Sequence, residues 1–322
     1  MRFADVAGHA RVIERLMRAV ARDQLPHTYL FAGPSGIGKF ATARALAARL
    51  LCDSPSTDAC GTCASCLSAD HETHPDLVTI RAAEGASEIK IDQVRDLQRR
   101  LRLRSVRSER KVAILDEAQY LNLPAQNAML KTLEEPPGSV LVILVASNVA
   151  GLLPTVLSRC QRITFFPLPN ELVERLLVQR CGMQADQAHD LAPFGEGSVG
   201  QALLFREDLI ERARTQLLPL LSDLARHPYA DLADLARDWG RLETAELLLL
   251  LRAPLAWYRQ RLADVAAAPT GRALHMALSQ LRTVYDTMER LRRHAHRQLA
   301  LDAMLLDLQW AAREARRHSG QR

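Results

Sequence analysis

Short runs of apolar residues alternate with helical patterns through the first half of the chain. Four of these runs contain few or no polar residues: Tyr29–Ala32, Leu77–Ile80, Lys111–Leu115 and Val140–Ala146. Their length suits strands, and their continuous apolar character is typical of parallel strands that are covered on both faces. A fifth strand is predicted over Ile163–Phe166. Because amphipathic helical patterns separate the strands, we predict an α/β fold with a parallel sheet.

The pattern changes at Pro167 and Pro169, after which the sequence shows helical periodicity and no convincing strand. Short helical segments as far as Phe205 predict a small helical lid domain. Longer segments follow, including one continuous helix over Glu243–Val265, and these predict an all-α domain. We therefore expect three domains, namely a nucleotide-binding-type domain over residues 1–166, a helical lid over 167–206 and a C-terminal helical domain over 207–322.

The composition is that of a folded globular protein, with 48% hydrophobic and 25% charged residues among 322. A net charge of +5 is compatible with a nucleic-acid partner, but an arginine-rich solvated surface gives the same value. The amino terminus lacks the apolar run of a signal peptide, and the longest apolar stretch, Leu247–Leu251, is too short to span a bilayer. We expect a cytoplasmic protein with no membrane contact and with reduced cysteines.

A phosphate-binding loop follows the first predicted strand. Gly33, four further residues, Gly38 and Lys39 fit the motif, and a predicted helix comes next. Gly33, Gly36 and Gly38 would let backbone N–H groups turn toward a phosphate, and Lys39 would reach the outer phosphates. The motif ends in a hydroxyl that binds Mg²⁺, but here Phe40 stands in its place and cannot ligate a hard cation. Binding of ATP with Mg²⁺ is therefore in doubt, and we expect hydrolysis to be lost.

An acidic pair, Asp116–Glu117, ends the strand predicted over Lys111–Leu115. Nucleotide hydrolases place such a pair there, so that the Asp holds Mg²⁺ through water and the Glu polarises the attacking water. The alternative is a glycine-rich turn in one place and an exposed acidic helix start in the other. The strand context of both motifs favours a nucleotide-binding fold.

Four closely spaced cysteines follow the helix after the phosphate loop. Two of the intervals have the CxxC spacing that holds two thiolates on one tetrahedral ion, so we predict a closed structural Zn²⁺ site. An iron–sulfur cluster and a chance grouping in an exposed loop are the alternatives. The ligands are predicted to be Cys52, Cys60, Cys63 and Cys66.

Other histidines and cysteines nearby are not needed as ligands, because four sulfurs complete the coordination shell. His71 and His74 are predicted to be surface residues. Cys160 and Cys181 are predicted to be packing residues.

Arg159 lies in a Ser-Arg-Cys sequence at the end of a short predicted helix. It is either an arginine finger, worth roughly 10³–10⁵ in rate on a neighbour's γ-phosphate, or an ordinary salt-bridged residue. Position alone favours the second interpretation. Arginines over Arg95–Arg110 and Arg290–Arg297 offer a DNA-binding alternative, but they lack interleaved aromatics and are read as solvated helix faces.

Two longer segments, Asn127–Pro137 and Leu153–Gln161, resemble clamp-loader subunits of bacterial DNA polymerase III, which belong to the AAA+ ATPases. The four-cysteine insertion and Lys111–Glu117 support the resemblance, which is strong from Ala4 to Phe166 and weaker beyond. It implies an AAA+ sheet domain with an inserted zinc module, a small helical lid, and a C-terminal helical collar through which subunits assemble.

Within this family, Phe40 implies a largely non-hydrolysing stator. Gln201 has the same implication, because it stands where the lid of a motor subunit carries a phosphate-sensing arginine. Ser147 and Asn148 do match the family's polar sensor after the fourth strand. The alternative is an active gamma/tau-type ATP-hydrolysing motor subunit, in which Ser35 is the nearest hydroxyl to the one that is lost.

The resemblance also implies partners. A stator subunit supplies Arg159 in trans to ATP on an adjacent motor subunit. The expected assembly is a hetero-pentamer with gamma/tau and delta subunits that loads the sliding clamp on primed DNA. The chain would then be a component of the DNA polymerase III holoenzyme with no ATPase or polymerase activity of its own.

Overall fold

The computed structural model describes residues 1–54, 57–82, 88–205, 211–267 and 271–319, and these form two compact units. The first comprises Met1–Met183 and Gly197–Gly200, and the second comprises Gln184–Glu196 and Gln201–Arg322. Residues 167–183 thus group with the sheet, whereas the sequence assigned them to a separate lid. The division into three domains stays a prediction.

The first unit is built on a five-stranded sheet in the order β2-β3-β4-β1-β5, and every neighbouring pair is parallel. This confirms the predicted α/β architecture. The strands are β1 (Thr28–Ala32), β2 (Leu77–Ile80), β3 (Lys111–Leu115), β4 (Val140–Ala146) and β5 (Gln161–Thr164).

Strand β5 begins two residues before the predicted start at Ile163. It is an edge strand on which only Ile163 is buried, so Gln161 and Arg162 look polar in sequence although they pair with β1. Phe165 lies beyond the strand, but its N–H still donates to the Ala32 carbonyl at 2.7 Å.

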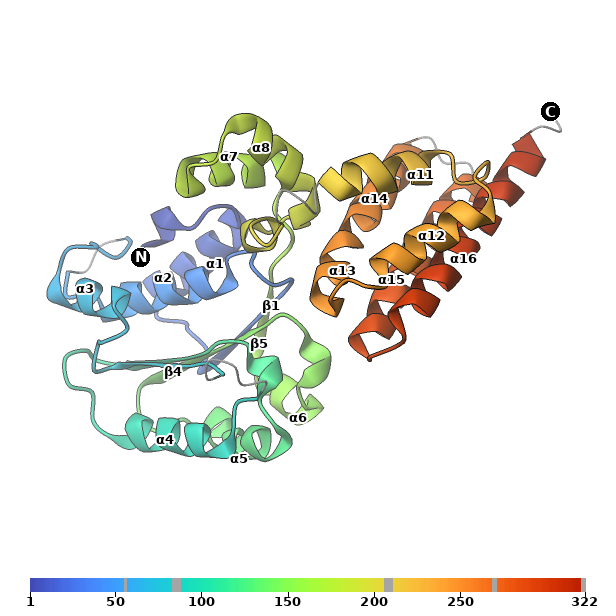
Figure 1. Ribbon diagram of the computed structural model, residues 1–322. Coiled ribbons are helices and arrows are strands. Elements are labelled where there is room, and N and C mark those ends of the chain that lie inside the picture. Colours follow the sequence, from blue (N-terminus) through green and yellow to red (C-terminus); the bar gives the residue numbers. More distant parts are fainter. Residues whose placement is uncertain (55–56, 83–87, 206–210, 268–270, 320–322) are drawn as a thin grey trace. The chain divides into compact units, whose positions relative to one another are not determined.

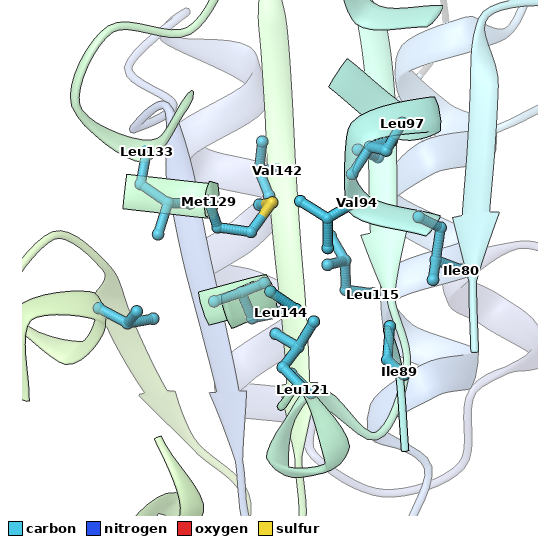
Figure 2. Close-up of a cluster of buried hydrophobic side chains, with 14 of the residues drawn as sticks. Ile80, Ile89, Val94, Leu97, Leu115, Leu121, Met129, Leu133, Val142 and Leu144 are labelled. Atoms are coloured by element: carbon cyan, nitrogen blue, oxygen red, sulfur yellow. The ribbon is translucent and has the colours of Figure 1, made fainter. Parts of the chain in front are cut away.

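Two hydrophobic cores cover the two faces of the sheet, and alternate residues of the central strands supply them. Tyr29 and Phe31 of β1 face one core, whereas Leu30 and Ala32 face the other. Figure 1 shows two helices on each face. The first face carries α1 (Ala10–Ala21) and α2 (Lys39–Leu51), and the second carries α4 (Ile91–Arg102) and α5 (Leu123–Glu134). Figure 2 shows the second core, where side chains of these two helices meet those of β3 and β4.

Helix α5 starts at a residue that suits a helix N-terminus. Asn122 accepts a hydrogen bond from the N–H of Ala125 at 3.0 Å, and Pro124 lies in the first turn, as predicted. The helices of the first unit are α1 (Ala10–Ala21), α2 (Lys39–Leu51), α3 (Ala64–Asp70), α4 (Ile91–Arg102), α5 (Leu123–Glu134), α6 (Pro154–Leu157) and α7 (Asn170–Cys181). Short 3₁₀ turns are η1 (Phe3–Asp5), η2 (Ala118–Tyr120) and η3 (Val149–Gly151).

The second unit has helices and no strand among the residues that the structure describes. Helix α15 packs between α14 and α16, and α16 also packs against α12. No described helix of the chain is long and apolar enough to cross a bilayer. The elements are α8 (Ala185–Leu191), η4 (Ala192–Gly195), η5 (Ala213–Leu217), α11 (Leu218–Ser222), α12 (Tyr229–Trp239), α13 (Thr244–Leu250), α14 (Arg252–Ala267), α15 (Gly271–Arg292) and α16 (Arg297–Ser319), while α9 (Val199–Ala202) spans the boundary between the units.

The single helix predicted over Glu243–Val265 is wrong, because the structure divides it into α13 and α14 at Leu251. Pro254 explains the division. It has no N–H to donate to the carbonyl of Leu250, so the hydrogen-bond ladder cannot run on without interruption. Leu251 and Leu255 resume it, with an N–H to carbonyl distance of 3.4 Å.

Candidate functional site

The phosphate loop joins β1 to α2 and has the backbone shape that the motif requires. Gly36 and Gly38 have φ values of 73° and 102°, in the left-handed region that favours glycine. At Gly33 a Cβ atom would lie 2.3 Å from the carbonyl oxygen of Phe165, so the close approach of β5 excludes any side chain. Helix α2 then begins at Lys39, two residues before the start predicted at Ala41.

A cavity of about 350 Å³ lies at the loop, and its lining brings most of the predicted nucleotide residues together. Gly33 and Asn148 are the exceptions. The Asn148 side chain instead accepts a hydrogen bond from the N–H of Ala150 at 2.8 Å and caps η3. The predicted residues that line the cavity are Gly36, Gly38, Lys39, Asp116, Glu117 and Ser147.

Lys39 is almost completely buried, with 5% of its surface exposed. Its Nζ donates to the carbonyl oxygen of Pro34 at 2.5 Å. Burial lowers the pKa of Lys39 to about 8, against the opposing effect of Asp116 and Glu117. Burial likewise raises the pKa of Asp116. The loop therefore presents a cation in a poorly solvated place, which suits an anionic ligand.

His9 braces the loop from the start of α1, a role that the sequence did not indicate. Its Nε2 lies 2.7 Å from the carbonyl oxygen of Ile37, so Nε2 carries the proton and donates. The His9 ring also packs edge-on against Phe165, with 4.9 Å between the ring centroids.

Phe40 makes the surroundings of the expected metal position unfavourable for Mg²⁺. The Cζ of Arg81 lies 5.3 Å from the centroid of the Phe40 ring, and the Cζ of Arg44 lies 5.9 Å from it. Mg²⁺ needs oxygen ligands in near-octahedral geometry, and here a ring with two guanidinium cations replaces the hydroxyl. The residues do not fit a directly bound Mg²⁺.

Sequence reasoning missed Arg44 and Arg81. Arg44 lies one helical turn after Phe40, and that spacing was visible. Arg81 directly follows β2, and only the observed pairing of β2 with β3 brings it next to the end of β3.

The four cysteines of the insertion converge as predicted. Their sulfur atoms all lie within 4.8 Å of one another, and the Sγ–Sγ distances are 3.9 Å for Cys52–Cys63 and for Cys60–Cys66. A tetrahedral ion with Zn–S bonds of about 2.3 Å places its sulfurs roughly 3.8 Å apart, so the donor set fits such an ion.

Backbone N–H groups also point at the sulfurs. The N–H of Cys63 donates to Cys60 at 3.3 Å, and that of Cys66 donates to Cys63 at 3.3 Å. The N–H groups of Thr62 and Cys63 lower the pKa of Cys60 to about 6. Such bonds stabilise thiolates, the form that binds a metal.

The prediction that His74 is a surface residue is wrong, because only 2% of it is exposed. Its Nδ1 accepts from the N–H of Asp76 at 3.1 Å, so Nε2 carries the proton and donates to Ser65 Oγ at 3.2 Å. Ser65 in turn donates to Asp53 at 2.6 Å. This chain of hydrogen bonds ties the cysteine insertion to the start of β2. His71 is exposed, as predicted.

Asp76 ends this chain and is fully buried. Its carboxylate accepts the N–H groups of Val106 at 2.8 Å, Arg107 at 2.8 Å and Ser108 at 2.9 Å. Burial alone would raise the pKa of Asp76, but these donors and His74 outweigh it and the pKa lies below its ordinary value. A charged Asp76 therefore holds the loop that precedes β3.

We expect Asp76→Asn to lower the free energy of unfolding by about 3 kcal/mol at neutral pH, because bonds to a charged acceptor are lost. A folded pKa below the unfolded value contributes stability that is present above the unfolded pKa and is lost as pH falls through the folded pKa. The difference between wild type and variant should therefore shrink below about pH 4. Urea unfolding across this pH range measures it.

Asp238→Asn is the matched control for this experiment. Asp238 is an exposed residue that pairs with Arg241 at 3.7 Å, and its replacement should change the free energy of unfolding by less than about 0.5 kcal/mol. An Asp76→Asn chain as stable as this control would contradict the assigned role.

Arg159 follows α6 and is held by its own chain. Its Nε donates to Glu134 Oε1 at 2.7 Å, its Nη2 contacts the same oxygen, and its Nη1 donates to the carbonyl of Thr155 at 2.8 Å. About a third of the side chain, 32%, is exposed. Arg159 is thus salt-bridged but lies at the surface of the unit.

The two remaining cysteines differ from each other. Cys160 packs against the second core, and burial raises its pKa to about 12, in agreement with the predicted packing role. Cys181 is exposed at the end of α7, so the packing role predicted for it is wrong.

The arginines of α4 pair with carboxylates of the same helix. Arg99 donates to Asp96 at 3.0 Å, and Arg95 lies 3.5 Å from Asp92. Both arginines are largely exposed. This arrangement is that of a solvated helix face, as predicted for these two residues.

The comparisons with known proteins show the family of the chain. The family described as "DNA polymerase III, delta subunit" matches residues 8–169. The delta' subunit of DNA polymerase III from Pseudomonas aeruginosa is 34% identical over 222 residues, which cover 68% of this chain and 67% of that protein. The chain belongs to the clamp-loader subunit family of DNA polymerase III.

Relatives of a second kind match at similar identity. The tau subunit from Bacillus subtilis is 34% identical over 173 residues, which cover 53% of this chain and 30% of that protein. The delta' subunit of the same organism is 30% identical over 210 residues, which cover 65% of this chain and 63% of that protein. The chain thus matches about a third of the length of the tau relative. Among solved structures, a gamma subunit-related protein from Thermotoga maritima aligns over 92% of this chain and 98% of its own, with a TM-score of 0.43 and 18% identity.

Proposed function

We propose that the chain is a delta-prime-type clamp-loader subunit, a stator that does not hydrolyse ATP and that supplies Arg159 to a neighbouring motor subunit. The observation that carries the proposal is Phe40, which occupies the position of the Mg²⁺ ligand between the guanidinium groups of Arg44 and Arg81. Assistance by a metal ion is worth several kcal/mol to phosphoryl transfer, and about 1.4 kcal/mol changes a rate tenfold. Loss of a direct ligand therefore costs orders of magnitude in rate.

The donors of Arg159 support the finger assignment. A guanidinium has five N–H groups, and Glu134 and Thr155 engage three of them. Among the described residues, one N–H on each of the two terminal nitrogens has no further partner, and such groups form charge-assisted hydrogen bonds with phosphate oxygens. Glu134 thus orients the side chain and leaves donors for a ligand.

We further propose that the four cysteines bind one structural Zn²⁺. In that role Cys52, Cys60, Cys63 and Cys66 would be thiolates, and the ion would supply the crosslink that holds the insertion together. The insertion packs onto the sheet domain through Cys66, which shares a small buried cluster with Ala48 of α2.

The partners follow from the same proposal. The chain would join gamma/tau motor subunits and a delta subunit in a cytoplasmic hetero-pentamer, with residues 167–206 as the lid and residues 207–322 as the collar. The assembly would load the sliding clamp on primed DNA as part of the DNA polymerase III holoenzyme. Gln201, in place of a phosphate-sensing arginine, supports the stator role.

The alternative is a gamma/tau-type motor subunit. It is favoured by one observation, that Lys39, Asp116, Glu117 and Ser147 still line one cavity. Ser35 also lines this cavity, and its hydroxyl is the candidate to replace the lost ligand.

The two functions differ in the activity of the isolated chain. We expect no Mg²⁺-dependent ATP hydrolysis above that of the Lys39→Ala variant, which reports any contaminating enzyme. Steady-state phosphate release from the purified full chain measures it. Turnover that depends on Mg²⁺ and disappears in Lys39→Ala would overturn the stator proposal in favour of the motor.

A further inference from the structure

We propose that the phosphate loop binds the phosphates of a nucleoside polyphosphate without a divalent cation, and that the Arg81 guanidinium supplies the positive charge that the metal supplies elsewhere. This inference goes beyond the stator role, which needs no nucleotide on this chain.

The position of Arg81 is the first support. In a phosphate-loop protein the metal lies among the side chain after the lysine, the acidic residue that ends the neighbouring strand, and the phosphates. The first two correspond here to Phe40 and Asp116, and both line the cavity. Arg81 lies against the Phe40 ring at 5.3 Å. Arg81 also interacts electrostatically with Asp116. Burial raises the pKa of Asp116, and the charge of Arg81 acts in the opposite direction.

The hydrogen bonds of Arg81 are the second support. Its Nη2 donates to both carboxylate oxygens of Glu72, at 2.7 Å and 2.9 Å. Among the described residues, neither Nε nor Nη1 of Arg81 donates to a partner. Half of the side chain, 50%, is exposed. Arg81 therefore keeps two donor nitrogens for an incoming phosphate.

Arg44, the second arginine beside Phe40, is held by the protein itself. Its Nη2 donates to the carbonyl oxygen of Asp70 at 2.7 Å, and only 22% of its side chain is exposed. It is anchored, and it packs on the Phe40 ring at 5.9 Å. Arg44 is thus held beside Phe40, whereas Arg81 lies on the Phe40 ring next to the cavity and is half exposed.

The cavity needs such a cation. Asp116 and Glu117 line it together with Lys39, so one positive charge faces two carboxylates. A polyphosphate would add further negative charge, and in a motor subunit Mg²⁺ compensates for it. A guanidinium is always charged, and its N–H groups form charge-assisted hydrogen bonds with phosphate oxygens. Arg81 supplies that compensation with a side chain of the protein.

The test is the affinity of the full chain for AMP-PNP, measured by isothermal titration calorimetry in EDTA and in excess Mg²⁺. This analogue is not hydrolysed, so the result does not depend on whether the chain is a stator or a motor. We expect measurable binding with dissociation constants that agree within about twofold in the two conditions, because no protein ligand holds the metal. Binding that requires Mg²⁺, or no binding in either condition, would overturn the proposal.

Substitutions test the contributions of Arg81 and Phe40 to nucleotide binding separately. Arg81→Ala should weaken AMP-PNP binding about tenfold or more in EDTA, since a charge-assisted contact with the phosphates is lost. Arg18→Ala is the matched control, because this exposed arginine of α1 pairs with Glu14 and should change nothing. In the double variant Phe40→Thr/Arg81→Ala a hydroxyl returns and the guanidinium is gone, so Mg²⁺ should now tighten binding about tenfold or more.

Thermal unfolding without ligand verifies that each variant is folded. Because Arg81 is half exposed and its pair with Glu72 is a surface pair, Arg81→Ala should leave the unfolding temperature within a few degrees of wild type. An Arg81→Ala chain that is folded and binds AMP-PNP as tightly as wild type would remove Arg81 from the site.

Discussion

Replacing Arg159 by alanine is expected to slow ATP hydrolysis on the adjacent motor subunit roughly 10³-fold or more, since an arginine finger contributes about 10³–10⁵ in rate. The loss should appear in the rate of the chemical step and not in nucleotide affinity, because the finger acts on charge that develops in the transition state. Single-turnover hydrolysis by the reconstituted complex on primed DNA measures it, with the other motor sites inactivated.

Arg162→Ala is the matched control for this change. Arg162 is an exposed arginine of β5, three residues further along the chain. The Arg162→Ala substitution should leave the single-turnover rate unchanged. Arg159→Ala should also leave assembly intact, which size-exclusion chromatography of the complex can verify. An unchanged rate in an assembled Arg159→Ala complex would remove the finger assignment.

Loss of one cysteine sulfur is expected to unfold the insertion. Structural Zn²⁺ contributes roughly 10–16 kcal/mol of apparent binding free energy in small zinc domains, far more than the few buried residues around Cys66 can supply. Cys63→Ala should therefore lower the zinc content from about one ion per chain to none. Protease should then cleave within residues 52–70. Metal analysis of protein purified without chelator, together with limited proteolysis, tests both expectations.

Cys181→Ala is the matched control, because Cys181 is an exposed cysteine outside the cluster. It should keep the zinc content and the protease resistance of wild type. If zinc-free wild-type protein has a folded, protease-resistant insertion, packing of the four cysteines without a metal is sufficient to fold it, and the zinc proposal is wrong. Iron in place of zinc would favour the iron–sulfur alternative.

The sheet could be predicted from sequence because its central strands carry a local signal. In β3 and β4 almost every residue is apolar and all are buried, so a short window identifies them. The signal weakens at the edge, where β5 buries only Ile163 and its bounds were predicted two residues late. The prediction of the C-terminal helices was wrong in one place for a related reason. Helical periodicity in the sequence continues through Pro254, although the backbone hydrogen-bond ladder does not.

Some residues of the candidate site could likewise be predicted from sequence, and others could not. Lys39 and the cysteines could be found because motif and spacing are local. Arg81 and His74 could not, because their roles depend on contacts between separate elements. The order of the strands brings Arg81 near Asp116, and the fold of the insertion buries His74 against Ser65. A polar residue that looks solvent-exposed in sequence becomes a buried partner only when a second segment covers it.

The strand order also has a consequence for synthesis of the chain. Within the described part of the chain, strand β1 pairs with β4 and β5 alone, which lie more than a hundred residues later, at Val140–Ala146 and Gln161–Thr164. Until those residues leave the ribosome, β1 has no hydrogen-bonded neighbour and the loop after it has no fixed shape. Pairing across so long a separation is intrinsically slow and leaves apolar strands exposed. We therefore expect Tyr29–Ala32 to stay without its strand partners until late in synthesis of the first unit.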